Sequence, residues 1–581
     1  MQKAQPPRNE LATALAACRH ALIALGIASA IINILYLTGS LYMLEIYDRV
    51  LPSRSVPTLI GLSILALGLY GFQAFLDLLR GRVLVRIGRS LGQNLSGRVY
   101  QAITQLTLRA RTQSDGLQPL RDLDQIRNYL SSPGPLAFLD LPWMPFYIGI
   151  CFIFHFWLGV AALTGAIILI IFTIFTEIFT RAPTKAATEY AAKRNGLAEA
   201  SRRNAEVLKA MGMTPPVGAK WNELNVKFLE AQQRASDVGG GFGAVSRVMR
   251  MALQSAMLGI GAYLVIYQEA TAGIIIAGSI LSARALAPVD LAIAHWRSFV
   301  GARQSWRRLK DLLAAFPPEN EQLALHRPVS SFAVEAVSIV PPGDRKVVVQ
   351  DMVFRLEKGN ALGIIGPNAS GKSCLARALV GVWQPARGTI RLDDAALDQW
   401  PTELLGRHVG YLPQDVELFS GTVAQNIARF QAEPKADDVL AAAQAAGVHE
   451  LILRLPEGYA TEIGEGGAAL SAGQRQRIAL ARALYGDPFL VVLDEPNSNL
   501  DAEGDEALTK AILSIRARGG IAVVIAHRPS TLAGADLVLV MAQGKAQLFG
   551  PKEEVLAKMM RRPPAAPAPL KIIREPGRVA S

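Results

Sequence analysis

The sequence predicts an α-helical six-span transmembrane domain followed by a soluble α/β domain. Apolar residues make up 51% of the 581 residues but are concentrated in the first half, where Ala21–Leu79 holds only five charged residues. After about residue 330, short apolar runs instead alternate with glycine-rich turns, as in soluble α/β domains. The charged fraction of 19% and the mean hydropathy of +0.25 exclude a disordered or fibrous protein. They also argue against a wholly soluble enzyme.

Six apolar stretches approach or meet the roughly 20 residues that a helix needs to cross a bilayer core. They are Leu22–Leu44, Val56–Leu76, Leu136–Phe156, Trp157–Phe179, Met251–Tyr267 and Ala272–Ile293. Any one stretch is compatible with a buried helix of a soluble protein, but six arranged in pairs favour membrane spans. The first is too long for a cleaved signal peptide, and a second span follows it after a short polar turn.

Basic residues gather in the two long segments between spans two and three and between spans four and five. The first segment contains Arg80, Arg82, Arg86, Arg89, Arg98, Arg109, Arg111, Arg121 and Arg127. The second contains Arg181, Lys185, Lys193, Arg194, Arg202, Arg203, Lys209, Lys220 and Lys227. The positive-inside rule therefore places both segments and both chain ends in the cytoplasm. It also explains much of the net charge of +12, so we expect no nucleic acid as a partner.

Both basic segments have a helical composition, so we expect them to extend the membrane helices into the cytoplasm as stalks. Within them, Leu120–Leu130 and Ala205–Met213 are typical of amphipathic turns of helix, either solvated or in contact with another domain. The cysteines Cys18, Cys151 and Cys374 are odd in number and far apart. They predict neither a disulfide framework nor a thiolate metal site.

The change in composition predicts the domain boundaries. We expect a cytoplasmic N-terminal segment at residues 1–20, a membrane domain with helical extensions at 21–310, and a linker at 311–330. The α/β domain is expected at residues 331–560, followed by a flexible Pro/Ala-rich tail at 561–581.

A phosphate-binding loop follows a predicted buried strand, Ala361–Ile365. The segment reads GPNASGKS, which is G-x-x-x-x-G-K-S between a strand and a helix. Its glycines let backbone N–H groups surround a phosphate, and the helix N-terminus adds a positive dipole. We expect Lys372 to reach the β- and γ-phosphates of ATP and the Ser373 hydroxyl to bind Mg²⁺. The predicted nucleotide-binding residues here are Gly366, Pro367, Asn368, Ala369, Ser370, Gly371, Lys372, Ser373 and Cys374.

A second apolar strand, Phe489–Leu493, ends in Asp494 and Glu495. A carboxylate at this place can hold the magnesium shell, and the next one can polarise the attacking water. We therefore predict a metal-binding role for Asp494 and a catalytic role for Glu495.

The segment Leu470–Gln474 (LSAGQ) resembles the signature motif of ABC ATPases, which a partner subunit contributes to a composite ATP site. The resemblance implies nucleotide contacts from Ser471, Ala472, Gly473 and Gln474. It also implies a D-loop aspartate at Asp501, a Q-loop residue at Gln414 with catalytic and metal-binding roles, and a catalytic switch histidine at His527. Gly464–Gly467 resembles the loop through which exporters contact their membrane helices.

Two positions depart from the family pattern. Ala472 stands where glycine is common, a small change that we expect to be tolerated. The aromatic residue that usually stacks on adenine is absent, and Pro341 lies near its expected position. This absence leaves base selectivity open.

Six spans followed by one ATPase domain resemble half of an ABC exporter, which implies a homodimer with the two amphipathic turns as coupling helices. Leu120–Tyr147, Tyr42–Leu51 and Glu206–Met213 resemble type I protein-secretion ATPases of the PrtD/HasD kind. The resemblance implies ATP-driven export of unfolded proteins with a C-terminal signal across the bacterial inner membrane. It also implies two partners, a periplasmic membrane fusion protein and a TolC-like outer-membrane channel.

About twenty residues precede the first span, so we expect no leader-cleaving peptidase domain there and unprocessed substrates. Asp140 and Asp290 either line a translocation path or mark the cytoplasmic membrane edge. Two alternative functions remain open. One is an exporter of lipid, peptide or drug, and the other is a membrane-anchored nucleotide sensor that transports nothing.

Overall fold

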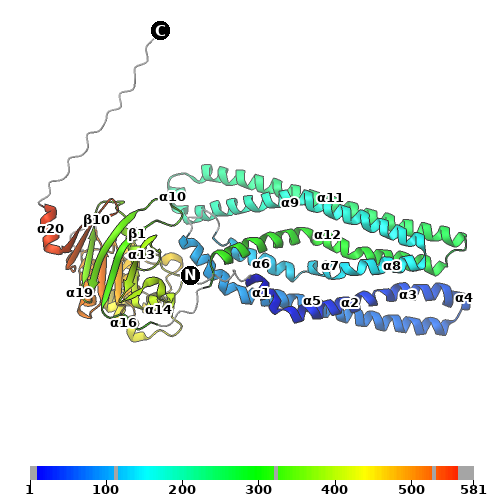
Figure 1. Cartoon of the computed structure of the whole chain (residues 1–581), viewed down its shortest axis with the longest axis horizontal. Helices are drawn as coiled ribbons and strands as arrows, with labels where there is room; N and C mark the ends of the chain where they lie inside the picture. The colour runs from blue at the N-terminus through cyan, green and yellow to red at the C-terminus, as the bar shows by residue number, and fades with distance from the viewer. Residues whose placement is uncertain (1–9, 110–115, 319–324, 527–531, 561–581) are drawn as a thin grey trace, which may run out of the picture. The chain divides into compact units, whose positions relative to one another are not determined.

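A computed structural model describes residues 10–109, 116–318, 325–526 and 532–560 of the chain. The chain divides into two compact units, a helical one up to Pro318 and an α/β one after it (Figure 1). The predicted fold class, a six-span helical domain followed by an α/β domain, is confirmed. His527 and the predicted tail at 561–581 lie outside the described residues.

The helical unit contains six helical runs long and apolar enough to cross a membrane within the described residues. They are Arg19–Ser53, Val56–Leu108, Gly134–Phe154, Phe156–Arg203, Thr214–Ile266 and Ala272–Ala315. The first run comprises α2 (Arg19–Leu35), α3 (Leu37–Glu45), a π-helix (Ile46–Val50) and α4 (Leu51–Ser53), and α1 (Glu10–Ala17) precedes it. The third comprises α7 (Gly134–Asp140), a 3₁₀ turn (Leu141–Trp143) and α8 (Met144–Phe154).

Four helices are much longer than a bilayer requires. They are α5 (Val56–Arg109), α9 (Phe156–Arg203), α11 (Thr214–Ile266) and α12 (Ala272–Ala315). At 1.5 Å per residue, the 54 residues of α5 extend for roughly 80 Å, against about 30 Å of hydrocarbon. The excess is long enough for the expected stalks, and α9 and α11 lie together along their length (Figure 1).

A buried ion pair joins the first three spans. Arg80 of α5 donates to both carboxylate oxygens of Asp140 at 3.1 Å, and both residues are less than one-tenth exposed. Ser29 and Asn33 of α2 each donate to the same carboxylate at 2.9 Å. Tyr147 of α8 in turn donates to the Asn33 carbonyl oxygen at 2.6 Å. Asp140 is therefore a packed structural group whose charge is fully paired.

Asp290 lies in a comparable but more open pair. Arg250 of α11 contacts its carboxylate at 3.1 Å, and the Ser246 hydroxyl donates to it at 3.4 Å. The Arg250 side chain is 38% exposed, so this pair is less completely removed from solvent than that of Asp140.

Hydrogen bonds join the turn after the first span to the start of α12. Asp48, in the π-helix, accepts hydrogen bonds from the Thr271 hydroxyl at 2.6 Å and from the Gly273 backbone N–H at 2.9 Å. A carboxylate at a helix N-terminus satisfies an orphan donor and complements the helix dipole. A Cβ on Gly273 would lie 2.7 Å from the Asp48 carboxylate, so a larger residue there would displace this carboxylate.

The two predicted amphipathic turns differ in their surroundings. Residues 120–130 lie in α6 (Gln118–Leu130), whose Asp122, Leu123 and Ile126 are buried within the helical unit. Asp122 accepts from Arg308 of α12 at 2.9 Å. Residues 205–213 begin with α10 (Ala205–Ala210), which has no buried residue, and Met211 beyond it is 71% exposed.

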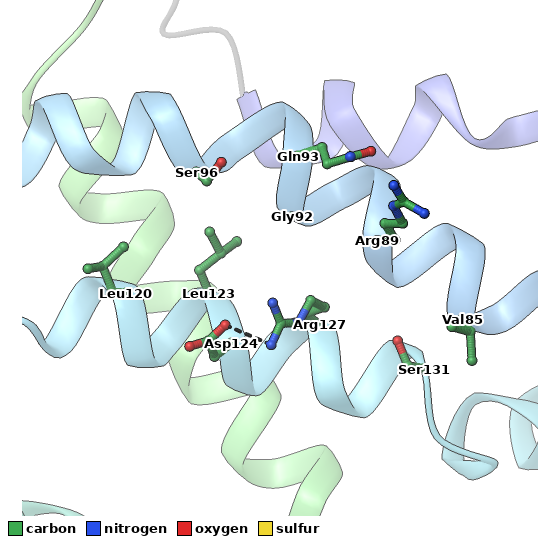
Figure 2. A pocket seen from close by; sticks show the side chains of 10 residues that line it. All are labelled: Val85, Arg89, Gly92, Gln93, Ser96, Leu120, Leu123, Asp124, Arg127 and Ser131. Atoms are coloured by element: carbon green, nitrogen blue, oxygen red, sulfur yellow. Dashed lines mark ion pairs between the residues drawn. The ribbon is translucent and has the colours of Figure 1, made fainter.

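Figure 2 shows α6 lying beside α5 across a groove of about 540 Å³. Glycines bring the helices together, since a Cβ on Gly88 would lie 2.1 Å from the Ser131 hydroxyl. Asp124 and Arg127, at the groove, form an exposed ion pair of 3.0 Å.

The α/β unit contains two sheets. A four-stranded sheet has the order β2-β1-β4-β5, and a six-stranded sheet has the order β10-β9-β3-β8-β7-β6. The strands are β1 (Ser331–Ile339), β2 (Val349–Glu357), β3 (Ala361–Ile365), β4 (Arg387–Leu392), β5 (Ala395–Ala396), β6 (Val409–Leu412), β7 (Leu490–Asp494), β8 (Ile521–Ile525), β9 (Leu537–Ala542) and β10 (Lys545–Pro551). The described helices are α13 (Lys372–Leu379), α14 (Thr402–His408), α15 (Val423–Ile427), α16 (Ala436–Ala445), α17 (His449–Leu453), α18 (Ala472–Leu484), α19 (Ala502–Ala517) and α20 (Lys552–Met560).

The centre of the larger sheet is parallel and fully enclosed. Strand β3 pairs in parallel with β8 and β9, and β7 pairs in parallel with β8 and β6. Every residue of β7 and β8 is buried, as expected for a sheet covered on both faces. The carboxyl ends of β3 and β7 therefore open on the same edge, where ligands bind in open α/β sheets.

We predict that Asp140→Ala destabilises the helical unit strongly, because it leaves Arg80 buried with only Asp77 as a charged partner. Breaking one side of a buried pair costs about 3–5 kcal/mol. The midpoint of thermal unfolding of the purified full chain measures the loss. Asp124→Ala is the matched control, because an exposed pair contributes about 0–1 kcal/mol. Equal midpoints for the two variants would contradict a structural role for the Arg80–Asp140 pair.

Candidate nucleotide site

The loop after β3 has a backbone that only particular residues can adopt. Gly371 has φ = +94°, and a Cβ there would lie 3.0 Å from a Val349 methyl group. A Cβ on Gly366 would lie 2.1 Å from the Met541 carbonyl oxygen. Both glycines are therefore required by geometry, and they turn the chain sharply from β3 into α13.

The Lys372 side chain folds back over this loop. Its Nζ donates to the carbonyl oxygens of Gly366 at 2.9 Å and Pro367 at 3.0 Å. The residue is only 5% exposed, and burial lowers the pKa of its ammonium group. A phosphate in the loop would offer this ammonium a stronger acceptor than two carbonyl groups do. The buried Ser370 hydroxyl has no hydrogen-bond partner among the described residues, so it is available to a ligand.

Asp494 faces the start of α13 from the end of β7. The Ser373 hydroxyl donates to its carboxylate at 3.2 Å. Asp494 is 1% exposed, and burial raises its pKa to about 6, with the neighbouring Glu495 also raising it and the Ser373 bond opposing. A hydroxyl and a carboxylate are oxygen donors of the kind that Mg²⁺ prefers, and a nearby cation would stabilise the ionised form of Asp494. These residues fit a magnesium ion.

Glu495 is held in an unusual conformation beside Asp494. Its φ is +51°, which is uncommon for a residue other than glycine, and its backbone N–H donates to the Ile525 carbonyl oxygen at 3.1 Å. The Gln414 amide N–H₂ donates to the Glu495 carboxylate at 3.2 Å, which leaves the amide oxygen of Gln414 for a cation. Strained backbone of this kind concentrates at functional sites. The structure thus brings together Lys372, Ser373, Gln414, Asp494 and Glu495.

The predicted signature residues begin α18. Ser471 is its N-cap, and Ser471 and Gln474 bond each other's backbone N–H groups in a capping box. Ser471 and Ala472 are exposed, and no described hydrogen bond joins residues 471–474 to the loop at 366–373. A Cβ on Gly473 would lie 3.0 Å from the Asn499 carbonyl oxygen, so this position has little room. Within the described residues of one chain, the signature and the phosphate loop are therefore not joined by hydrogen bonds.

Asp501 caps α19. Its carboxylate accepts from the Gly504 backbone N–H at 2.9 Å and pairs with Arg477. The Gly504 bond and then Arg477 hold the pKa of Asp501 below its usual range. The Asp501 carboxylate is therefore already bonded to groups of its own chain, the Gly504 N–H and Arg477.

Gln476 has a structural role that the sequence motifs do not predict. This buried side chain donates to the Glu495 carbonyl oxygen at 3.3 Å and accepts from the Asn499 backbone N–H at 3.1 Å. It therefore connects the signature helix to the residues after β7. A buried amide on the core side of a helix is the signal that identifies such a residue.

Pro341 is buried in the turn between β1 and β2. Farther along this turn, the Val348 carbonyl oxygen lies 3.2 Å from the place that a Cβ on Gly371 would occupy. The turn therefore borders the phosphate loop through Val348.

Comparison with known proteins agrees with this geometry. A family model described as the ABC transporter transmembrane region matches residues 22–289, and one described as ABC transporter matches residues 349–498. A bacterial Atm1-family ABC exporter with ATP bound superposes with a TM-score of 0.77 over 94% of this chain and 97% of that chain. At 22% identity, this likeness concerns the fold alone.

Several secretion proteins are similar in sequence. The toxin RTX-I translocation ATP-binding protein of Actinobacillus pleuropneumoniae is 28% identical over 91% of this chain and 76% of its own length. The cyclolysin secretion/processing ATP-binding protein CyaB of Bordetella pertussis is 27% identical over 94% of this chain and 77% of its own length.

A much closer likeness spans both units. The type I secretion system ATP-binding protein PrsD of Rhizobium meliloti is 59% identical over 550 residues, which cover 95% of this chain and 94% of that protein. Identity at this level includes the membrane helices as well as the ATPase motifs. The chain therefore belongs to the type I secretion system ATP-binding proteins of the ABC transporter family.

Proposed function

We propose that this chain is the ATP-driven inner-membrane exporter of a type I secretion system, and that it moves unfolded polypeptides with a C-terminal signal out of the cytoplasm. The observation that carries the proposal is the 59% identity to a type I secretion ATP-binding protein across nearly the whole chain. The six candidate spans and the basic cytoplasmic segments support an inner-membrane location.

The ATPase site supports a magnesium-dependent hydrolysis. The loop at 366–371 and Lys372 would hold the phosphates, with Ser373, Asp494 and the Gln414 amide oxygen holding Mg²⁺. The bound cation would neutralise charge that develops on the phosphates. Glu495 would polarise the attacking water, since Gln414 already orients its carboxylate at 3.2 Å. We propose His527 as a further catalytic residue on the family motif alone.

A homodimer supplies the missing part of the site. Ser471 and Ala472 are exposed, and no described hydrogen bond joins them to the chain's own phosphate loop. Two copies related by a two-fold axis would each present residues 471–474 to the partner's nucleotide. In this arrangement neither copy completes an ATP site without the other.

The exposed α10 is the better supported coupling element. The apolar face of α6 is already buried within the helical unit, whereas Val207 and Met211 at α10 are 49% and 71% exposed. We propose that α10 transmits ATP-driven closure of the ATPase domains to the membrane helices. A periplasmic membrane fusion protein and a TolC-like outer-membrane channel would complete the path across the envelope.

Deleting the gene from its own cell tests the export function. We expect one or more polypeptides to disappear from the culture medium and to return with the wild-type chain but not with Glu495→Gln. We also expect the Glu495→Gln protein to co-purify with a periplasmic membrane fusion protein, the adaptor of the system, and with a secreted polypeptide. Unchanged secretion, together with phospholipid stimulation of the wild-type ATPase without an adaptor, would instead identify a lipid exporter.

We predict that Glu495→Gln lowers ATP hydrolysis by about 10²–10⁴-fold while ATP binding is retained, because only the polarising carboxylate is lost. Phosphate release and retention of labelled ATP on the purified chain measure the two effects. Glu503→Gln is the control, since this glutamate is 83% exposed and should leave both unchanged. Normal turnover in Glu495→Gln would refute the proposed catalytic role.

The composite site predicts complementation between two inactive variants. Lys372→Ala and Ser471→Arg should each abolish ATPase activity as homodimers. Random pairing yields about half mixed dimers, and each of these keeps one intact site if the signature acts across a two-fold interface. Co-expression should therefore restore measurable hydrolysis. Continued inactivity of purified mixed dimers would place both residues in the same site of one chain.

A further inference from the structure

One buried amide side chain bonds the backbone of Glu495, the proposed catalytic residue. Gln476 lies near the start of α18 and is 2% exposed. Its Nε2 donates to the Glu495 carbonyl oxygen at 3.3 Å and also to the Pro496 carbonyl oxygen. Its Oε1 accepts from the Asn499 backbone N–H at 3.1 Å. Both ends of the amide are therefore bonded to the segment that follows β7.

The backbone conformation of Glu495 needs such support. Its φ of +51° is energetically costly for a residue other than glycine, and a conformation of this kind persists only where the surrounding structure holds it. The Glu495 N–H donates to the Ile525 carbonyl oxygen of β8 at 3.1 Å. The Glu495 carbonyl oxygen accepts from Gln476 and from the Ser498 N–H, each at 3.3 Å. The residue is thus held by β8 on one side and by α18 on the other.

The helix α18 lies close to the segment after β7 along one face. A Cβ on Gly473 would lie 3.0 Å from the Asn499 carbonyl oxygen. Arg477 pairs with Asp501. Positions three and four apart lie on the same face of a helix, so Gly473, Gln476 and Arg477 form a continuous contact surface. Within this surface, Gln476 is the side chain that bonds Glu495.

The position of the Glu495 carboxylate depends on its backbone. The carboxylate accepts from the Gln414 amide at 3.2 Å, beside Asp494 and Ser373. Catalysis is sensitive to such placement, because a displacement of about 1 Å can lower a rate by about 10²-fold. The described hydrogen bonds of the Gln476 amide all go to residues 495–499. Gln476 therefore acts on the site only through other residues.

We propose that Gln476 is a positioning residue for ATP hydrolysis, which fixes the Glu495 backbone so that the carboxylate of the same chain faces the attacking water. The inference rests on the proposed catalytic role of Glu495. A different role is that Gln476 only supports α18, whose first residues would serve the nucleotide of the partner copy. The two roles act on different ATP sites of a homodimer, so an experiment can separate them.

Gln476→Met tests the positioning role in the purified full chain. Methionine has a similar length but cannot replace the three backbone hydrogen bonds. We expect kcat to fall by about tenfold to hundredfold, because the Glu495 carboxylate is no longer held in place. The Kd for ATP should stay within about twofold, since the phosphate loop is not altered. Phosphate release and retention of labelled ATP measure the two effects.

A matched control separates positioning from stability. Asn360, at the opposite end of β3 from the phosphate loop, accepts from the Glu357 N–H at 2.8 Å and donates to the Asp536 carboxylate at 3.1 Å. Asn360→Met should lower the midpoint of thermal unfolding and leave kcat unchanged. Gln476→Asn keeps the amide but shortens its reach by one methylene. It should also lower kcat, and it provides the same test if Gln476→Met does not fold.

Mixed dimers, purified through a different affinity tag on each copy, show which site Gln476 serves. With Glu495→Gln in one copy, ATP is hydrolysed only at the site of the intact Glu495. We expect the loss in rate only when Gln476→Met is in the copy that carries this intact Glu495. A loss that appears when Gln476→Met is in the Glu495→Gln copy would identify support of the signature instead and would overturn the inference.

The homodimer measurements distinguish failure of this inference from failure of the proposed function. Normal hydrolysis by the Glu495→Gln chain would overturn the catalytic role on which the inference rests. Normal kcat in Gln476→Met, together with an inactive Glu495→Gln chain, would overturn the inference alone. A fall in kcat equal to that of Asn360→Met would likewise overturn it, because the effect would then follow stability.

Discussion

The hydrocarbon core of a bilayer has no hydrogen-bond partners to offer, and the helical unit is built around that constraint. Long α-helices satisfy their own backbone, so each span needs external partners only where it begins, ends or carries a polar side chain. At such places the protein supplies hydrogen-bonding and charged partners from its own side chains. Asp48 caps α12, and Arg80 and Asp140 neutralise each other with help from Ser29 and Asn33.

The same demand for complete pairing shapes the ATPase unit. Its central parallel strands are sealed on both faces, so polar chemistry is possible only where the strands end. The loop at 366–371 follows one such end, and Asp494 and Glu495 lie at another. Burial gives Asp494 a pKa of about 6, and a bound cation would oppose that burial effect. A bound cation and the phosphates of a nucleotide would therefore balance the buried charges of Asp494 and Lys372.

Prediction from sequence worked where one local pattern determines one structure. Bilayer thickness sets span length, so the six apolar stretches identified the spans, and the glycine spacing before Lys372 identified the phosphate loop. Contacts could not be predicted where the two residues are far apart in the sequence. Arg80 and Asp140 are sixty residues apart, and Gln476 gained its role only through the fold of residues 495–499. The burial of α6 against α12 could likewise not be predicted. Asp122 is a charged residue, which is usually exposed, and its partner Arg308 is far away in the sequence.

The strand order of the ATPase unit has a consequence for biosynthesis. Strand β3, which carries the phosphate loop, is flanked by β8 and β9, and these strands are translated more than 150 residues later. Parallel pairing over such a separation forms slowly, and only after the later strands exist. The membrane helices are therefore synthesised and available for insertion while the phosphate loop still lacks its neighbours. The phosphate loop of an unfinished chain therefore lacks the two strands that flank β3 in the finished ATPase unit.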